Sequence, residues 1–170
     1  ELYTSLQTGV IDALEWVGPY NDLAFGFHEV AKYYYYPGWH EPGSMLELIV
    51  NRQSFEALPA DLQAIVTYAA RAANQDMLDE FTARNNAALQ ELVEVHGVQL
   101  RRLPDEVLLA LWRGSEEVMQ QLVASDPMAA KVYASFKSFY DGARAYHHIS
   151  EQAYINARDV VMDSELEPVP

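Results

Sequence analysis

Residues 58–97 read LPADLQAIVTYAARAANQDMLDEFTARNNAALQELVEVHG. The start Leu58-Pro59-Ala60-Asp61 is typical of a helix beginning, because proline and an acid are both favoured in the first turn. Apolar side chains then recur every 3.6 residues as far as Val93, and Gly97 is a natural stop. An unbroken helix of about 37 residues would be about 55 Å long at 1.5 Å per residue. We therefore predict a helix that either lies across more than one lobe or reaches a partner chain.

The residues before this helix have a mixed α/β character. We expect short elements here, namely helices over 1–9 and about 22–31, strands over Lys32–Tyr36 and Ser44–Asn51, and a short strand or turn over Val10–Trp16. Val, Ile and Tyr favour strands, and the apolar run Leu48-Ile49-Val50 is typical of a strand buried on both faces.

The residues after the long helix are mostly helical. We expect a short strand over Val98–Leu103, a helix from Pro104-Asp105, a helix with Pro127 in its first turn, and a last helix after Ser150. The predicted fold class is α/β, mostly helical with a few short strands and one long helix. The predicted parts are residues 1–57, 58–97 and 98–170.

Charge and composition exclude several classes of function. The 170 residues include 25 acidic and 11 basic side chains, a formal net charge of −14. Such a chain repels nucleic acid and anionic membranes, so we expect no nucleic-acid partner. No cysteine is present, which excludes disulfides, thiol catalysis and cysteine-bound zinc. The chain also starts at Glu1 within a helical pattern and without an initiator Met, so we expect it to be a fragment whose signal peptide lies outside it.

Two acidic residues stand at unusual positions. Glu15 and Trp16 end an apolar stretch shortly before a proline, and Glu41 lies between the turn dipeptides Pro37-Gly38 and Pro42-Gly43. Either acid, taken alone, is compatible with a solvated carboxylate on the surface. If both follow neighbouring strands, they would meet at the edge where open α/β sheets hold ligands. Two carboxylates and a backbone carbonyl would then suit a hard cation, which could neutralise an anionic ligand.

The same region resembles a known family. The segments LQTGVIDA (6–13) and Glu15-Trp16 resemble the solute-binding proteins of TRAP transporters, the extracytoplasmic subunits of tripartite ATP-independent periplasmic transporters. The segments VGPYNDL (17–23) and AKYYYYPGWHEPG (31–43) are similar to the 2-oxoacid-binding branch of that family. The likeness is detailed over about residues 1–95 and rests on helical pattern beyond them.

The resemblance implies a site and a ligand. It implies the carboxyl-terminal part of a two-lobed periplasmic binding protein, not an enzyme, which captures a small 2-oxoacid such as pyruvate. Glu15 and Glu41 would bind a sodium or calcium ion through their carboxylates, and Trp16 would bind it through its backbone carbonyl. The Trp16 side chain and Glu41 would also contact the organic acid. The arginine that binds the ligand carboxylate in this family would lie outside this chain.

The resemblance also implies partners and a location. Residues 1–57 would bind the ligand and the cation, 58–97 would connect, and 98–170 would pack against a lobe and form a homodimer. The protein would act in the periplasm and deliver its ligand to the TRAP membrane subunits.

Two alternatives remain open from the residues themselves. Glu15 and Glu41 could be the acid/base pair of an enzyme, as paired carboxylates are in glycosidases. Residues 59–170 could instead form a helical assembly module that binds no ligand.

Overall fold

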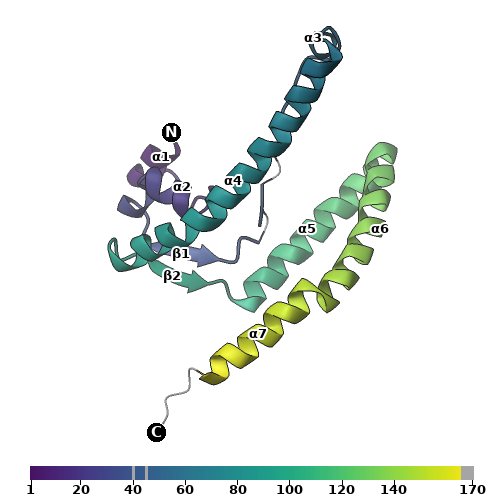
Figure 1. Cartoon of the computed structure of the whole chain (residues 1–170). Helices are drawn as coiled ribbons and strands as arrows, with labels where there is room; N and C mark the ends of the chain where they lie inside the picture. Colours follow the sequence, from purple (N-terminus) through teal and green to yellow (C-terminus); the bar gives the residue numbers. More distant parts are fainter. Residues whose placement is uncertain (40, 45, 166–170) are drawn as a thin grey trace. The chain divides into compact units, whose positions relative to one another are not determined.

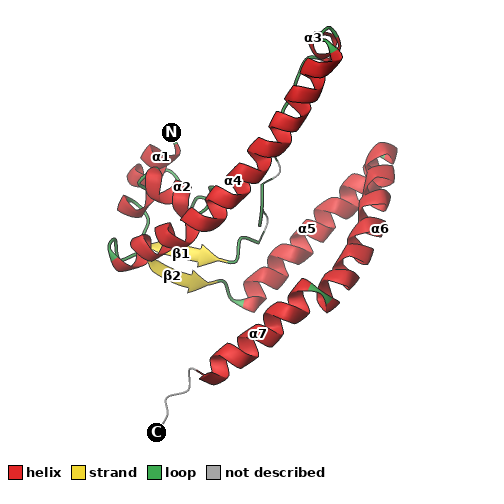
Figure 2. Ribbon diagram, viewed as in Figure 1, coloured by secondary structure: helices red, strands yellow, loops and turns green. Residues whose placement is uncertain are grey.

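The computed structural model describes residues 1–39, 41–44 and 46–165, with side chains up to Met162. The chain divides into two compact units, Glu1–Asp105 and Glu106–Pro170, each of which is considered by itself. Helices dominate both units, and the strands are short (Figures 1 and 2). Within the described residues, no helix combines the length and the apolar character that a membrane span requires.

In the first unit most short elements lie at the carboxyl end of a long helix, whereas α3 lies at its amino end (Figure 1). In chain order its elements are α1 (Leu2–Thr8), α2 (Pro19–Ala24), the 3-10 helix η1 (Phe27–Glu29), β1 (Tyr33–Tyr36), α3 (Arg52–Glu56), α4 (Ala60–Glu94) and β2 (Gln99–Arg102). Strands β1 and β2 pair in parallel, with Tyr33 opposite Gln99 and Tyr36 opposite Arg102. The ladder continues at both ends, because Gln99 donates to the Lys32 carbonyl at 2.8 Å and Leu103 donates to the Tyr36 carbonyl at 2.8 Å.

The predicted long helix is confirmed as α4, with 35 residues. It ends at Glu94, three residues before the predicted stop Gly97, which adopts a left-handed φ of 68°. The next residue, Val98, then donates to the Leu92 carbonyl at 2.9 Å, which closes the carboxyl end of the helix. The buried apolar side chains of the described residues, Ala88, Leu92 and Val98, lie at this end, so the small core is here.

The predicted strand over Ser44–Asn51 is wrong. The described residues 46–51 form no regular element, and Leu48 and Ile49 are 63% and 82% exposed. A strand needs a neighbour that satisfies its backbone hydrogen bonds. Among the described residues the sheet consists of β1 and β2, which pair with each other. Asn51 instead caps α3, because its side chain accepts from the Ser54 N–H at 3.0 Å.

Two further predictions near the amino terminus needed correction. Residues 10–16 contain no strand and form an irregular loop. The single helix expected over 22–31 is divided into α2 and η1, because Gly26 adopts a left-handed φ of 73° between them. Helix α2 begins earlier than expected, with Pro19 in its first turn, where the missing proline N–H costs no hydrogen bond.

The second unit consists of the helices α5 (Asp105–Ser125), α6 (Pro127–Ile149) and α7 (Glu151–Glu165). These helices confirm the sequence-based prediction. Asp126 caps α6 by accepting from the Met128 N–H at 2.7 Å. Neither α5 nor α6 contains a buried residue. Large apolar side chains are exposed along all three helices, among them Trp112, Phe136, Phe139, Ile149, Tyr154 and Val160.

Candidate functional site

Trp16 lies in the loop between α1 and α2, where two phenylalanine rings hold its indole. The Trp16 ring meets Phe25 at a centroid distance of 5.4 Å and Phe27 at 6.1 Å, edge-on in both cases. Phe25 and Phe27 stack on each other at 6.0 Å. Edge-to-face contacts of this kind fix the orientation of a ring more than simple burial does. The Trp16 side chain nevertheless stays 37% exposed, and the adjacent Glu15 is exposed as well, so both residues can reach a ligand.

The buried carboxylate of Asp22 fixes the backbone that follows Trp16. Asp22 is 8% exposed. It accepts from the Gly18 N–H at 3.4 Å and from the Tyr34 hydroxyl of β1. Burial raises the pKa of Asp22, while hydrogen bonds from Tyr34 and from the backbone of Gly18 and Val17 oppose that rise. Burial and the neighbouring Asp22 carboxylate raise the pKa of Tyr34, so this phenol stays protonated and donates.

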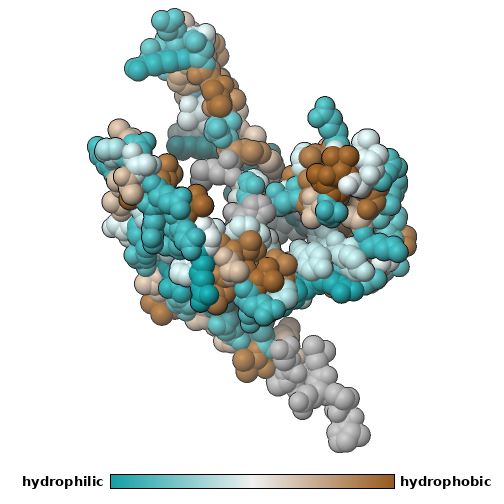
Figure 3. Space-filling model, turned by 180° about the vertical axis from the view of Figure 1, so that it is seen from behind, coloured by the Kyte–Doolittle hydropathy of each residue, from teal (hydrophilic) through white to brown (hydrophobic). Residues whose placement is uncertain are grey.

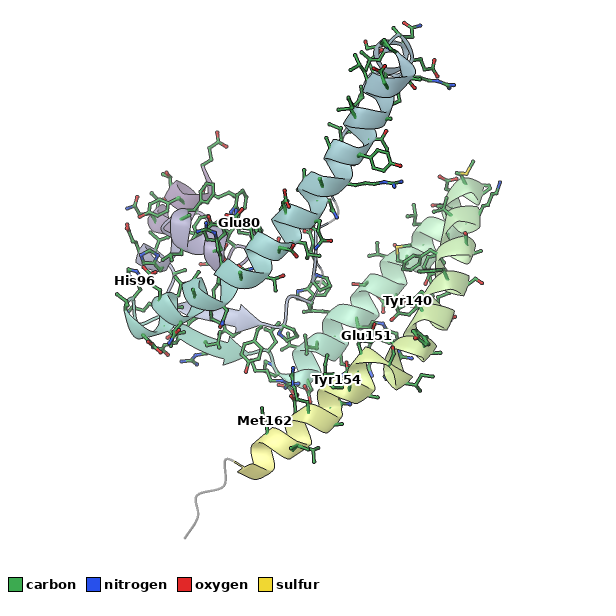
Figure 4. The ribbon with its side chains drawn as sticks, in the orientation of Figure 1. Glu80, His96, Tyr140, Glu151, Tyr154 and Met162 are labelled. Carbon is green, nitrogen blue, oxygen red and sulfur yellow. The ribbon has the colours of Figure 1, made fainter. Side chains whose placement is uncertain are left out.

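The long helix completes the support of this loop. Gly18 is the N-cap of α2 but has no side chain to cap it. The Tyr20 N–H instead donates to Asn85 Oδ1 of α4 at 2.9 Å. The Tyr20 ring meets Phe81 edge-on at 5.8 Å, and its hydroxyl reaches Glu80, labelled in Figure 4, at 3.5 Å. Helix α4 therefore holds α2 through residues 60 or more positions away in the sequence.

Glu41 lies in the turn-rich segment after β1. It is exposed, and its backbone carbonyl lies close to Gly38. Glu15, Trp16 and Glu41 all belong to the first unit. Glu15 and Trp16 come directly before α2, and Glu41 follows β1. No group of three or more histidine and acidic side chains suited to a metal occurs among the described residues. The predicted cation ligands are two carboxylates and one backbone carbonyl, which suit a hard cation. The cation site stays a prediction.

A small hollow lies next to the Asp22–Tyr34 contact. It has a volume of about 30 Å³, and its lining includes Asp22, His28, Tyr34 and Leu92. The His28 ring packs against His96 of the segment after α4 at 3.9 Å between centroids. A hollow of this volume suits water rather than an organic acid.

Several supporting residues were missed by the sequence analysis. Asp22 was placed only at the start of the helix expected over about 22–31, and Tyr34 was not distinguished from the other three tyrosines of β1. Alternation along the strand could have separated Tyr34 from Tyr33 and Tyr35, which are 50% and 53% exposed. No local signal pointed to Asn85, because its partner is far away in the sequence.

The model of the DctP family, bacterial extracellular solute-binding protein, family 7, matches residues 1–126. The chain belongs to this family. It is 36% identical over 156 residues to a monocarboxylate 2-oxoacid-binding periplasmic protein of Nostoc sp., a match that covers 92% of this chain and 43% of that protein. The resemblance inferred from residues 6–43 is therefore confirmed.

A solved structure extends the comparison to the fold. A TRAP transporter solute-binding protein from Bordetella bronchiseptica superposes with a TM-score of 0.87 at 33% identity, over 96% of this chain and 48% of that one. Its crystals contain a mixed-occupancy dimer, with copurified calcium and picolinate in one active site and an apo site in the other. The chain thus spans less than half the length of both relatives.

Family membership excludes one of the open alternatives, the acid/base enzyme. The family and the solved relative are binding proteins. The prediction that this chain is not an enzyme is confirmed, and the acid/base enzyme is set aside. The predicted fold class, mostly helical with a few short strands and one long helix, also fits part of a TRAP solute-binding protein.

Proposed function

We propose that this chain forms the cation-binding side of an extracytoplasmic receptor that captures a small 2-oxoacid, such as pyruvate, for a TRAP transporter. The observation that carries the proposal is the loop at Glu15-Trp16, whose indole is held by two phenylalanines and whose following backbone is fixed by Asp22. The Nostoc relative supports the ligand class, and the Bordetella relative supports a cation next to an organic carboxylate.

The cation would be held by the carboxylates of Glu15 and Glu41 and by the carbonyl of Trp16. Its charge would offset that of the organic acid, which a chain of net charge −14 otherwise repels. Calcium is the first ion to test, because it copurified with the Bordetella protein. Sodium is the second, since oxygen ligands suit both ions. The location would be the periplasm, and the carboxylate-binding arginine would lie outside this chain.

The test is isothermal titration of the full-length protein with pyruvate, after chelation and with calcium or sodium added back. We expect binding that requires a cation. Glu15→Gln and Glu41→Gln should each weaken cation binding at least about tenfold, because a charged ligand is lost. Glu47→Gln is the matched control, since Glu47 is an exposed acid of the same unit. Absence of pyruvate binding under every cation condition would contradict the proposal.

The second unit supports an additional role in assembly. Its helices α5 and α6 bury no residue, although large apolar side chains line them. Contiguous apolar surface of this kind marks interaction sites. We infer that the second unit and the exposed part of α4 contribute to a homodimer.

A further inference from the structure

Asp22 lies between the two segments that carry the proposed cation ligands. On one side it accepts from the Gly18 N–H at 3.4 Å, two residues after Trp16. On the other side it accepts from the Tyr34 hydroxyl of β1, the strand that leads to Glu41. One buried carboxylate thus ties both segments together.

The Gly18 hydrogen bond bears on the proposed ligand carbonyl, because a single residue, Val17, separates Gly18 from Trp16. The Val17 N–H and the Trp16 carbonyl belong to the same peptide group, which is planar. Within that plane the N–H and the carbonyl oxygen point in opposite directions, so a carboxylate near the Val17 N–H favours a Trp16 carbonyl directed away from Asp22. A backbone carbonyl has no rotamers of its own, so its direction depends on hydrogen bonds of this kind.

Of the four tyrosines of β1, Tyr34 is the one whose hydroxyl bonds to Asp22. Tyr33, Tyr35 and Tyr36 are 50%, 53% and 44% exposed, whereas Tyr34 turns inward and donates to Asp22. Its hydrogen bond serves a charged acceptor away from water, where such a bond is strong. The loop and β1 therefore cannot shift independently without breaking it.

We propose that Asp22 and Tyr34 are positioning residues of the cation site, which set the Trp16 carbonyl and the Glu15 carboxylate in a fixed relation to the strand that leads to Glu41. This proposal rests on the proposed function, because it assigns a role toward the same cation. Neither residue contacts the ion: Asp22 acts through the backbone of Val17 and Gly18, and Tyr34 acts through Asp22.

The experiment compares Tyr34→Phe with Tyr35→Phe in the full-length protein. Both variants lose one phenol oxygen from the same strand, but only the Tyr34 hydroxyl bonds to Asp22. Calcium affinity is measured by titration at saturating pyruvate, at a temperature where every variant is folded. We expect Tyr34→Phe to weaken calcium binding about 10- to 100-fold, as loss of a supporting partner does at metal sites. Tyr35→Phe should bind calcium as the wild type does.

A purely structural role gives a different result. In that case Tyr34→Phe lowers the melting temperature without calcium, yet the folded protein keeps its calcium affinity, and the proposal is overturned. Asp22→Asn is the second variant if Tyr34→Phe does not fold, with the same loss expected and wild-type affinity again overturning the proposal. A wild-type protein that binds neither calcium nor sodium with pyruvate refutes the proposed function instead.

Discussion

Asp22 is a buried carboxylate that accepts hydrogen bonds from Gly18 and Tyr34. Its pKa is raised above the ordinary 3.8, chiefly because burial disfavours the charged form. A raised pKa in the folded state means that the folded protein holds the proton more tightly than the unfolded chain does. The resulting stabilisation is present below pH 3.8 and is lost as the pH rises through the pKa of the folded state.

This linkage gives a prediction for Asp22→Asn. The stability of the wild type relative to the variant should fall as the pH rises from below 3.8, and should become constant above the raised pKa. Urea unfolding of the full-length protein over that range measures the difference. Asp61→Asn, which changes an exposed acid at the start of α4, serves as the control. A difference that grows with pH would mean that the hydrogen bonds to Asp22 outweigh its burial.

At the scale of elements, α2 depends on α4 for its first turn. The Tyr20 N–H has its partner in Asn85 rather than in a local cap. Asn85→Ala should therefore destabilise the protein by about 0.5–2 kcal/mol, as loss of a helix cap does. Asn86→Ala, at the exposed neighbouring position of the same helix, should have little effect. Thermal unfolding of the two variants side by side measures this, and equal melting temperatures would show that water replaces Asn85 at no cost.

The elements differ in how far the sequence could predict them. Helix α4 followed from its 3.6-residue periodicity, and α6 followed from Asp126-Pro127, because both signals are local. The strand over Ser44–Asn51 failed for the opposite reason: its apolar run favours a strand, but a strand also needs a neighbour. The parallel pairing of β1 with β2 and the contact of Asn85 with α2 depend on which distant segments meet, which periodicity does not reveal.

The candidate site shows the same division. Glu15, Trp16 and Glu41 are candidates from the sequence because charged and aromatic residues next to turns are conspicuous and because the motifs resemble a family; their role in the site stays a prediction. Their supports were harder to find. The phenylalanine pair and Asp22 act through packing and burial, and alternation along the strand could separate Tyr34 only from Tyr33 and Tyr35. Burial of one tyrosine among four is decided by the packing of the surrounding unit, not by the tyrosines themselves.

At the scale of the whole molecule, many large apolar side chains are exposed. Tyr140, Tyr154 and Met162, labelled in Figure 4, are 45%, 70% and 54% exposed. The face shown in Figure 3 likewise carries apolar residues over several elements. Further exposed apolar side chains lie in the first unit, at Leu46, Leu48, Ile49 and Val50 and in the early turns of α4. A chain that spans less than half the length of its relatives leaves these surfaces to be covered by other parts or by another copy.

Homodimer formation through the second unit gives the last prediction. Phe136→Glu places a charge among the exposed apolar side chains of α6. If the dimer buries this position, the unpaired charge costs several kcal/mol, and light scattering after size exclusion should show a monomer. Ser138→Glu adds the same charge about 200° around the helix and should leave a dimer. A wild type that stays monomeric at high concentration would contradict the role in assembly.

The parallel pairing of β1 with β2 also sets the order in which the polypeptide can fold as it is made. Among the described residues, the strand partner of 33–36 is 99–102, which is synthesised only after the residues of α4. Asn85, the partner of Tyr20, likewise appears late. Contacts between such distant positions form slowly. During synthesis on a ribosome, the tyrosines of β1 therefore stay unpaired until β2 has been made. Translation that stops before Gln99 yields a chain that lacks the β1–β2 pair next to the segment with Glu15, Trp16 and Glu41.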